Sequence, residues 1–77
     1  MDYEMIDKII SILREGERLS IKELYEKLLE RGEEVSPATV LKWVEVGIAL
    51  GKIKEKDYGN VRIVWIEKEG KNGLEKD

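Results

Sequence analysis

The side chains best suited to binding chemistry in this sequence are cations, and they gather in its second half. Residues 36–68 hold six basic and four acidic side chains, whereas residues 1–35 hold six basic and ten acidic ones. Clustered lysines and arginines are the usual means of holding phosphate groups. The basic side chains of the second half are Lys42, Lys52, Lys54, Lys56, Arg62 and Lys68. This half is therefore the candidate for phosphate contacts, although the net charge of −3 for the whole chain is not typical of a nucleic-acid binder.

Catalytic and metal-binding chemistry find little support in the sequence. The chain has no Cys and no His, which removes thiolate chemistry and the commonest general base and metal ligand. Its acidic residues are scattered, and no nucleophile lies next to a base. Glu33 and Glu34 could chelate a cation together, but we interpret them as a solvated turn. We therefore expect no enzyme, no cofactor and no metal site.

Composition also bears on environment. Charged residues make up 40% of the 77 residues, and Gln is absent, which is typical of proteins from hyperthermophiles. The apolar runs are only a few residues long, too short to span a membrane. The N-terminus has neither the basic start nor the apolar core of a signal peptide. These features predict a single thermophilic, cytoplasmic domain.

The first predicted helix runs from Asp2, a plausible N-cap, to about Glu15, and Gly16 ends it. Its core stripe is predicted to consist of Ile6, Ile9, Ile10 and Leu13. Met5 and Ile12 widen this stripe beyond one core face. Two interpretations remain open for them: packing at the edge of the core, or a helix–helix contact in a dimer.

The second predicted helix has the clearest start signal. Ser20 and Glu23 have the spacing of a capping box, and Leu19 and Leu24 flank it as a hydrophobic staple. The helix should run from Ile21 to about Arg31. Its inward residues are predicted to be Ile21, Leu24, Tyr25, Leu28 and Leu29. The preceding residues 17–19 are too short for an independent strand, but they can add an edge strand to a later hairpin.

The third predicted helix spans Ser36 to Leu50. Ser36 is placed to cap it, Pro37 occupies the first helical position, and Gly51 follows the end. Helical periodicity turns Val40, Val44, Gly47 and part of Ile48 inward. The outward arc holds Ala38, Thr39, Lys42, Glu45, Val46 and Ala49.

From Lys52 the apolar pattern changes to a period of two, which predicts a hairpin around the sequence DYGN with a loop of two or four residues. One face should carry Ile53, Glu55, Asp57, Arg62, Val64 and Ile66. The other should carry Lys52, Lys54, Lys56, Tyr58, Val61, Ile63 and Trp65. The lysines can also serve as ordinary protection of a sheet edge. The domain is predicted to occupy residues 1–68, and residues 69–77 to form a disordered tail.

Three stretches in this order carry a family resemblance: LSIKEL at residues 19–24, SPATV at 36–40 and LGKI at 50–53. Over residues 2–68 the chain resembles the winged helix-turn-helix superfamily, and small bacterial, archaeal or archaeal viral transcription regulators in particular. The resemblance implies an α+β fold of order α-β-α-α-β-β. It also implies double-stranded DNA as partner, with the third helix in the major groove and the hairpin on the minor groove or the phosphates. By position, the DNA-binding residues would be Ser36, Ala38, Thr39, Lys42, Lys54, Lys56, Tyr58, Asn60 and Arg62.

The third helix departs from the pattern of a DNA reader. It offers Lys42 and little else to base edges, and Glu45 follows one turn later. We expect either a homodimer, which doubles the DNA contacts, or a larger contribution to sequence specificity from the hairpin, called the wing, and from DNA shape. Candidate dimer surfaces are the first helix and the face of Val61, Ile63 and Trp65. The alternative function is a winged-helix protein-interaction module without DNA binding; stacking of single strands on Tyr58 or Trp65 is a minor option.

Overall fold

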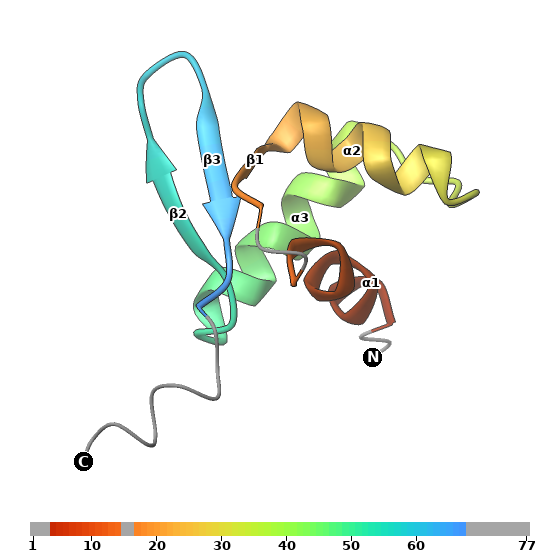
Figure 1. Ribbon diagram of the computed structural model, residues 1–77, viewed down its shortest axis with the longest axis horizontal. Helices are drawn as coiled ribbons and strands as arrows, with labels where there is room; N and C mark the ends of the chain where they lie inside the picture. Colours follow the sequence, from red (N-terminus) through yellow and green to blue (C-terminus); the bar gives the residue numbers. More distant parts are fainter. Residues whose placement is uncertain (1–3, 15–16, 68–77) are drawn as a thin grey trace.

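The computed structural model describes residues 4–14 and 17–67 of the chain. The elements follow one another as α1 (Glu4–Leu13), β1 (Leu19–Ser20), α2 (Ile21–Glu30), α3 (Pro37–Ala49), β2 (Lys54–Asp57) and β3 (Arg62–Trp65). Figure 1 shows the helices on one side and the β2–β3 hairpin standing beside them. This arrangement confirms the predicted α+β winged helix. The predicted tail and the predicted start and stop of the first helix lie outside the described residues.

The capping signals act as the sequence predicts. The backbone N–H of Glu23 donates to Ser20 Oγ at 3.0 Å, and the N–H of Ser20 donates to Glu23 Oε1 at 2.9 Å, which completes the capping box of α2. Ser36 caps α3 through its Oγ, which accepts the N–H of Thr39 at 3.1 Å. At the other end Gly51 has φ +77°, the left-handed conformation that ends a helix at low cost only for glycine.

The sheet has the order β1-β3-β2, and both pairings are antiparallel. Leu19 lies opposite Val64, so the short β1 joins the first half of the chain to its last strand. The edge strand predicted over residues 17–19 is therefore real but begins two residues later than expected, and it consists of two residues. In the hairpin, Lys54 lies opposite Trp65 and Lys56 opposite Ile63, which confirms the predicted sharing of faces.

The turn of the hairpin is built on Gly59. Its φ is +97°, and its N–H donates to Asp57 Oδ1 at 2.8 Å. The N–H of Tyr58 donates to the carbonyl of Val61 at 2.8 Å and closes the turn. Residues 58–61 therefore connect the two strands.

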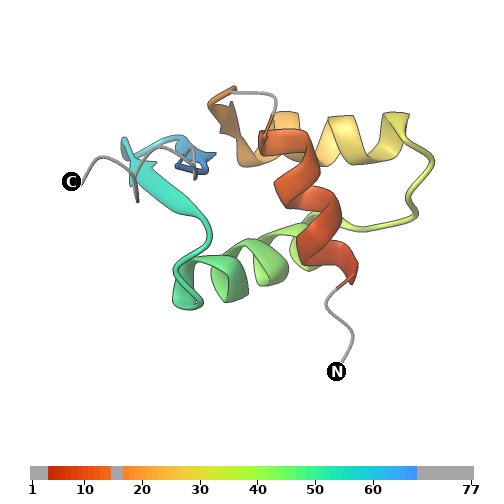
Figure 2. The same cartoon turned by 60° about the horizontal axis from the view of Figure 1, so that its bottom comes forward.

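Figure 2 shows the three helices and the sheet arranged around a common centre. Side chains from all of these elements form the core. Its buried side chains are Ile6, Ile9, Ile12, Leu13, Leu19, Leu24, Leu28, Val40, Val44, Ile53 and Val64. Two predictions for individual residues are wrong. Ile12, not Ile10, completes the buried stripe of α1, because Ile9, Ile12 and Leu13 face α2 and α3 together while Ile10 is half-buried. Leu29 is 44% exposed, because it lies on the side of α2 away from the core.

The burial of Ile12 also bears on the predicted dimer. Its side chain is fully buried within one chain, and Met5 packs against the edge of the same core. Edge-of-core packing therefore explains the wide apolar stripe of α1. The helix–helix dimer contact is not needed to account for it.

Candidate nucleic-acid interface

The outward side of α3 is the first candidate surface. Val40, Val44 and Gly47 are buried against the core, as predicted. Gly47 allows close packing, because a Cβ added there would lie 2.9 Å from Cγ1 of Ile53. The exposed residues of the helix are Pro37, Ala38, Leu41, Lys42, Glu45 and Ala49. This surface is uncharged apart from one cation and one carboxylate.

Two of the predicted DNA-binding residues, Ser36 and Thr39, contribute to the start of α3. Besides accepting the N–H of Thr39, the hydroxyl of Ser36 donates to Thr39 Oγ1 at 3.0 Å. The pair satisfies a backbone N–H of the first turn, so both hydroxyls have a structural role. Any contact they make with a phosphate would be added to that role.

Lys42 is the cation of this surface. Its ammonium lies 5.2 Å from the centroid of the Trp43 ring, within the range of a cation–π contact. No carboxylate in the described part of the chain pairs with it. The exposed side chain is therefore available to a ligand that approaches α3.

Arg62 ties the hairpin to α3. Its Nε donates to Glu55 Oε1 at 2.9 Å, and one terminal nitrogen donates to Glu55 as well. The same terminal nitrogen donates to Glu45 Oε2 at 3.0 Å. The hydrogen bond that Arg62 donates to Glu55 raises the pKa of Arg62 above its ordinary value; burial opposes this, and the bond to Glu45 and the charges of both carboxylates raise the pKa further. Arg62, predicted as a DNA contact near the wing tip, thus already holds two carboxylates.

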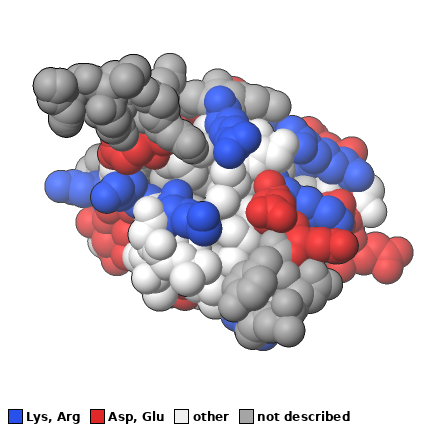
Figure 3. Space-filling model, turned by 90° about the horizontal axis from the view of Figure 1, so that it is seen from below, with Lys and Arg blue, Asp and Glu red and all other residues white. Residues whose placement is uncertain are grey.

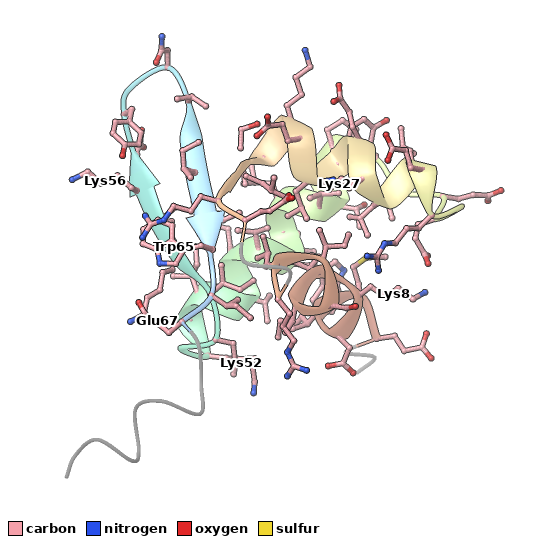
Figure 4. The ribbon with its side chains drawn as sticks, in the orientation of Figure 1. Lys8, Lys27, Lys52, Lys56, Trp65 and Glu67 are labelled. Atoms are coloured by element: carbon pink, nitrogen blue, oxygen red, sulfur yellow. The ribbon has the colours of Figure 1, made fainter. Side chains whose placement is uncertain are left out.

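The pairing register divides the predicted wing residues between two surfaces. Since Arg62 reaches Glu45, the hairpin face of Glu55 and Arg62 is the one turned toward α3. Lys54 and Lys56 belong to the opposite face. Figure 4 shows Lys56 pointing away from the helices. The nine predicted residues therefore do not form one continuous site.

On the face with the lysines, Trp65 carries an arginine. The Arg18 guanidinium carbon lies 4.0 Å from the centroid of the Trp65 ring, a stacked cation–π arrangement. Sequence reasoning missed Arg18 as a neighbour of the wing. Only the pairing of β1 with β3 brings them together, and the two-residue β1 left a weak signal in the sequence.

The tip of the hairpin is the third surface that carries predicted DNA-binding residues. Tyr58 is 60% exposed, and Asn60 is exposed beside it. The ammonium of Lys56 lies 6.0 Å from the Tyr58 ring. Both tip residues are free to meet a groove or a backbone, as the prediction requires.

A groove of about 490 Å³ separates the tip from the helices. Its lining residues are Ser20, Ile21, Lys22, Leu41, Asp57, Gly59, Asn60, Val61 and Arg62. Leu41 and Val61 are exposed apolar residues within it. Leu41 belongs to neither the inward nor the outward set predicted for the third helix, and no pattern along the chain indicates that it shares a groove with Val61.

One solved structure resembles this fold. It is described as giving structural insights into the DNA recognition and protein interaction domains of HOP2 and its homologous DNA pairing properties. The two chains share 27% sequence identity with a TM-score of 0.71, and the match covers 79% of this chain and 95% of the other. No protein-family model and no curated protein matches the chain.

Other kinds of site find no support in the described residues 4–14 and 17–67. They hold no group of three or more acidic side chains that could bind a metal ion. None of their helices is long and apolar enough to cross a membrane.

On the face seen in Figure 3, basic and acidic side chains lie beside one another around an uncharged area.

Proposed function

We propose that this chain binds double-stranded DNA, with α3 in the major groove and the hairpin tip on the adjacent backbone or minor groove. The observation that carries the proposal is the winged-helix architecture, shared with a HOP2 structure whose description names DNA recognition. The exposed side of α3 supports it, because Ala38 lies one turn before Lys42 and its small side chain lets this end of the helix approach base edges closely. We propose no catalytic role.

The finer proposal is a transcription regulator in the cytoplasm that acts as a homodimer. The sequence resemblance supports this proposal. So does the small number of base-contacting side chains on α3, because a single lysine cannot make one copy of the helix specific for a DNA sequence. The HOP2 structure is described through homologous DNA pairing instead, so DNA binding in that context is equally consistent with the fold. Sedimentation of the chain with and without a palindromic duplex tests the homodimer; a monomer in both would contradict it.

The test of DNA binding is a titration of a random duplex at several salt concentrations. Each phosphate contact should contribute a slope of about −0.9 in log affinity against log salt. Lys42→Ala should weaken binding, and Lys8→Ala is its matched control, since Lys8 pairs with Glu33 at 3.0 Å on the helical side. Absence of binding at low salt would refute the proposal, and equal affinities for the two variants would remove α3 as the reader.

A second candidate function is a protein-interaction module. The groove with Leu41 and Val61 favours it, because two exposed apolar side chains in one groove suit a partner's hydrophobic residue. The description of HOP2 also names protein interaction domains. A stoichiometric partner whose binding is abolished in Leu41→Ser, with no affinity for duplex DNA, would decide for this function.

A further inference from the structure

Three basic side chains, Arg18, Lys54 and Lys56, lie on the face of the hairpin that is turned away from α3, and two more line a hollow at its base; we name this surface the outer cationic face. Its members are Arg14, Arg18, Lys52, Lys54 and Lys56, all of them exposed. Within residues 4–14 and 17–67, none of the five forms an ion pair. By contrast, Lys8, Lys27 and Arg62 each hold a carboxylate. The outer cationic face is thus a concentration of uncompensated positive charge.

The five side chains are neighbours in space. Lys54 lies opposite Trp65 in the sheet, and Arg18 stacks on the ring of Trp65. At the base of the hairpin, Lys54 lines a hollow of about 280 Å³ together with Lys52 and Arg14. Its other lining residues are Ile10, Gly51, Ile66 and Glu67. Figure 4 shows Lys56, Trp65 and Lys52 following the hairpin from its upper part to its base.

This face is separate from the outward side of α3. The two are on opposite sides of a single sheet, since Glu55 and Arg62 point to α3 and their strand neighbours point away. The α3 side carries Lys42 and the twice-bonded Arg62, opposed by Glu45, Glu55 and Asp57. Electrostatics alone therefore favours the outer cationic face over α3 for holding a polyanion.

A second copy of the chain is a poor occupant of this face. A two-fold contact places each residue near the same patch of the partner, so the lysines of one copy would meet those of the other. Among the described carboxylates, Glu67 lines the basal hollow, and Glu17, which precedes Arg18 in the sequence, lies 3.9 Å from Lys27 of α2. Two carboxylates from each copy cannot offset the five cations that each copy brings. This disfavours the Val61, Ile63 and Trp65 face as the predicted dimer surface.

A nucleic-acid backbone fits the face better. Lys54 and Lys56 are two residues apart on an extended edge strand, which spaces them by about 6.8 Å. Along the helix axis each DNA strand carries a phosphate about every 3.4 Å, and the phosphates wind around that axis, so two ammonium groups on flexible stems can both reach phosphates of one strand. Exposed lysines on a flexible stem also suit phosphates as point charges.

We infer that the outer cationic face is a second phosphate-binding surface, so that one chain holds two duplex segments, one at α3 and one behind the wing. The inference rests on the proposed binding of duplex DNA at α3. It adds a second contact without base readout, because the face offers cations and few groups suited to base edges.

The experiment uses two short duplexes, one with a donor and one with an acceptor dye, and measures energy transfer as protein is added. The wild type should bring the two duplexes together. Lys54→Gln combined with Lys56→Gln should abolish this transfer while keeping binding of a single duplex. The double substitution should also reduce the slope of log affinity against log salt concentration by about 0.9 for each phosphate that the variant no longer holds. The matched control is Lys8→Gln combined with Arg31→Gln, which makes the same change in net charge on the helical side.

The outcomes separate the two claims. Absence of any duplex binding by the wild type refutes the proposed function and this inference together. Binding without energy transfer refutes the inference alone, as does transfer that persists in the Lys54 and Lys56 double variant, since a dimer with two copies of α3 would then explain it. If the double variant loses only binding to polyglutamate, the face serves an acidic protein and the inference is overturned. Thermal melting of this variant, followed by circular dichroism, must match that of the wild type, as expected for two exposed side chains.

Discussion

Arg62 and Glu45 are joined across the gap between the wing and α3 by a 3.0 Å hydrogen bond between charged groups. The Glu45 side chain is 54% exposed, so this bond lies at the surface. Because Arg62 also holds Glu55, one guanidinium fixes the hairpin relative to the helix that is proposed to read DNA. The angle between the hairpin and α3, the two elements proposed to contact DNA, therefore depends on Arg62 of β3.

Replacing Arg62 by Ala should cost about 0.5–1 kcal/mol in unfolding free energy, as expected for exposed ion pairs. Urea denaturation measures the change, and Lys22→Ala is the control because Lys22 is exposed and unpaired in the described part of the chain. Equal losses of stability in the two variants would show that the tie to Glu45 and Glu55 contributes nothing.

The same tie should not respond to pH in the neutral range. The pKa of Arg62 is raised by its carboxylate partners, Glu55 chiefly, so the contribution of the tie is complete below the pKa of the unfolded state and is lost only as the pH rises through the higher pKa of the folded state, far above neutral pH. The stability difference between wild type and Arg62→Ala should therefore be the same at pH 7 and pH 9. A difference that shrinks between these values would mean that another group controls the tie.

Glu45→Gln should strengthen duplex binding about three- to tenfold at low salt, because it removes a negative charge that faces the phosphates from α3. The gain should fall as salt is raised, since exposed charges are screened. Glu26→Gln makes the same charge change on an exposed site of α2 and should have a smaller effect. If the two variants bind alike, α3 does not face the duplex.

Gly47→Ala should destabilise the fold by about 1–3 kcal/mol, because the added methyl group meets the Cδ1 and Cγ1 atoms of Ile53. Ile53 is only 2% exposed and has little room to move. Gly51→Ala is an instructive comparison: nothing lies within 4 Å of the added atom, so its cost comes from the positive φ alone and should be about 1 kcal/mol. Thermal melts of both variants separate crowding from backbone strain.

Ser36→Ala should cost about 1 kcal/mol through the loss of the cap of α3. Ser36→Asp keeps a capping oxygen and should retain stability, but it places a negative charge where the first turn would approach a phosphate. Weaker duplex binding by the Asp variant at wild-type stability would support the predicted DNA contact of Ser36. Unchanged binding would leave this residue with its capping role only.

The fold was largely predictable because its signals are local. The capping box at Ser20, the cap at Ser36 and the switch to a period of two after Gly51 each depend on a few adjacent residues. The error at Ile10 and Ile12 has a different origin. Both are isoleucines near one stripe, and only the crossing of α1 over its two neighbours decides which of them is buried.

The candidate site was less predictable than the fold. Sequence periodicity correctly separated Lys54 and Lys56 from Arg62, and the position of Ile53 directly after α3 indicates that its hairpin face turns inward, but no pattern shows how that face is oriented on α3. That orientation follows from the bond between Arg62 and Glu45, which joins residues from different elements. The position of Arg18 beside Trp65 likewise depends on a pairing of two residues that leaves almost no pattern in the chain.

The two-residue strand β1 has a mechanical consequence. Ser20 pairs with Ile63 and at the same time caps α2, while Leu19 is buried opposite Val64. The lower half of the hairpin is thus anchored to the helices, and only residues 58–61 project as an overhang. We therefore expect the hairpin to be flexible at its tip and rigid at its base. Adaptation to a ligand would then be confined to the turn around Gly59.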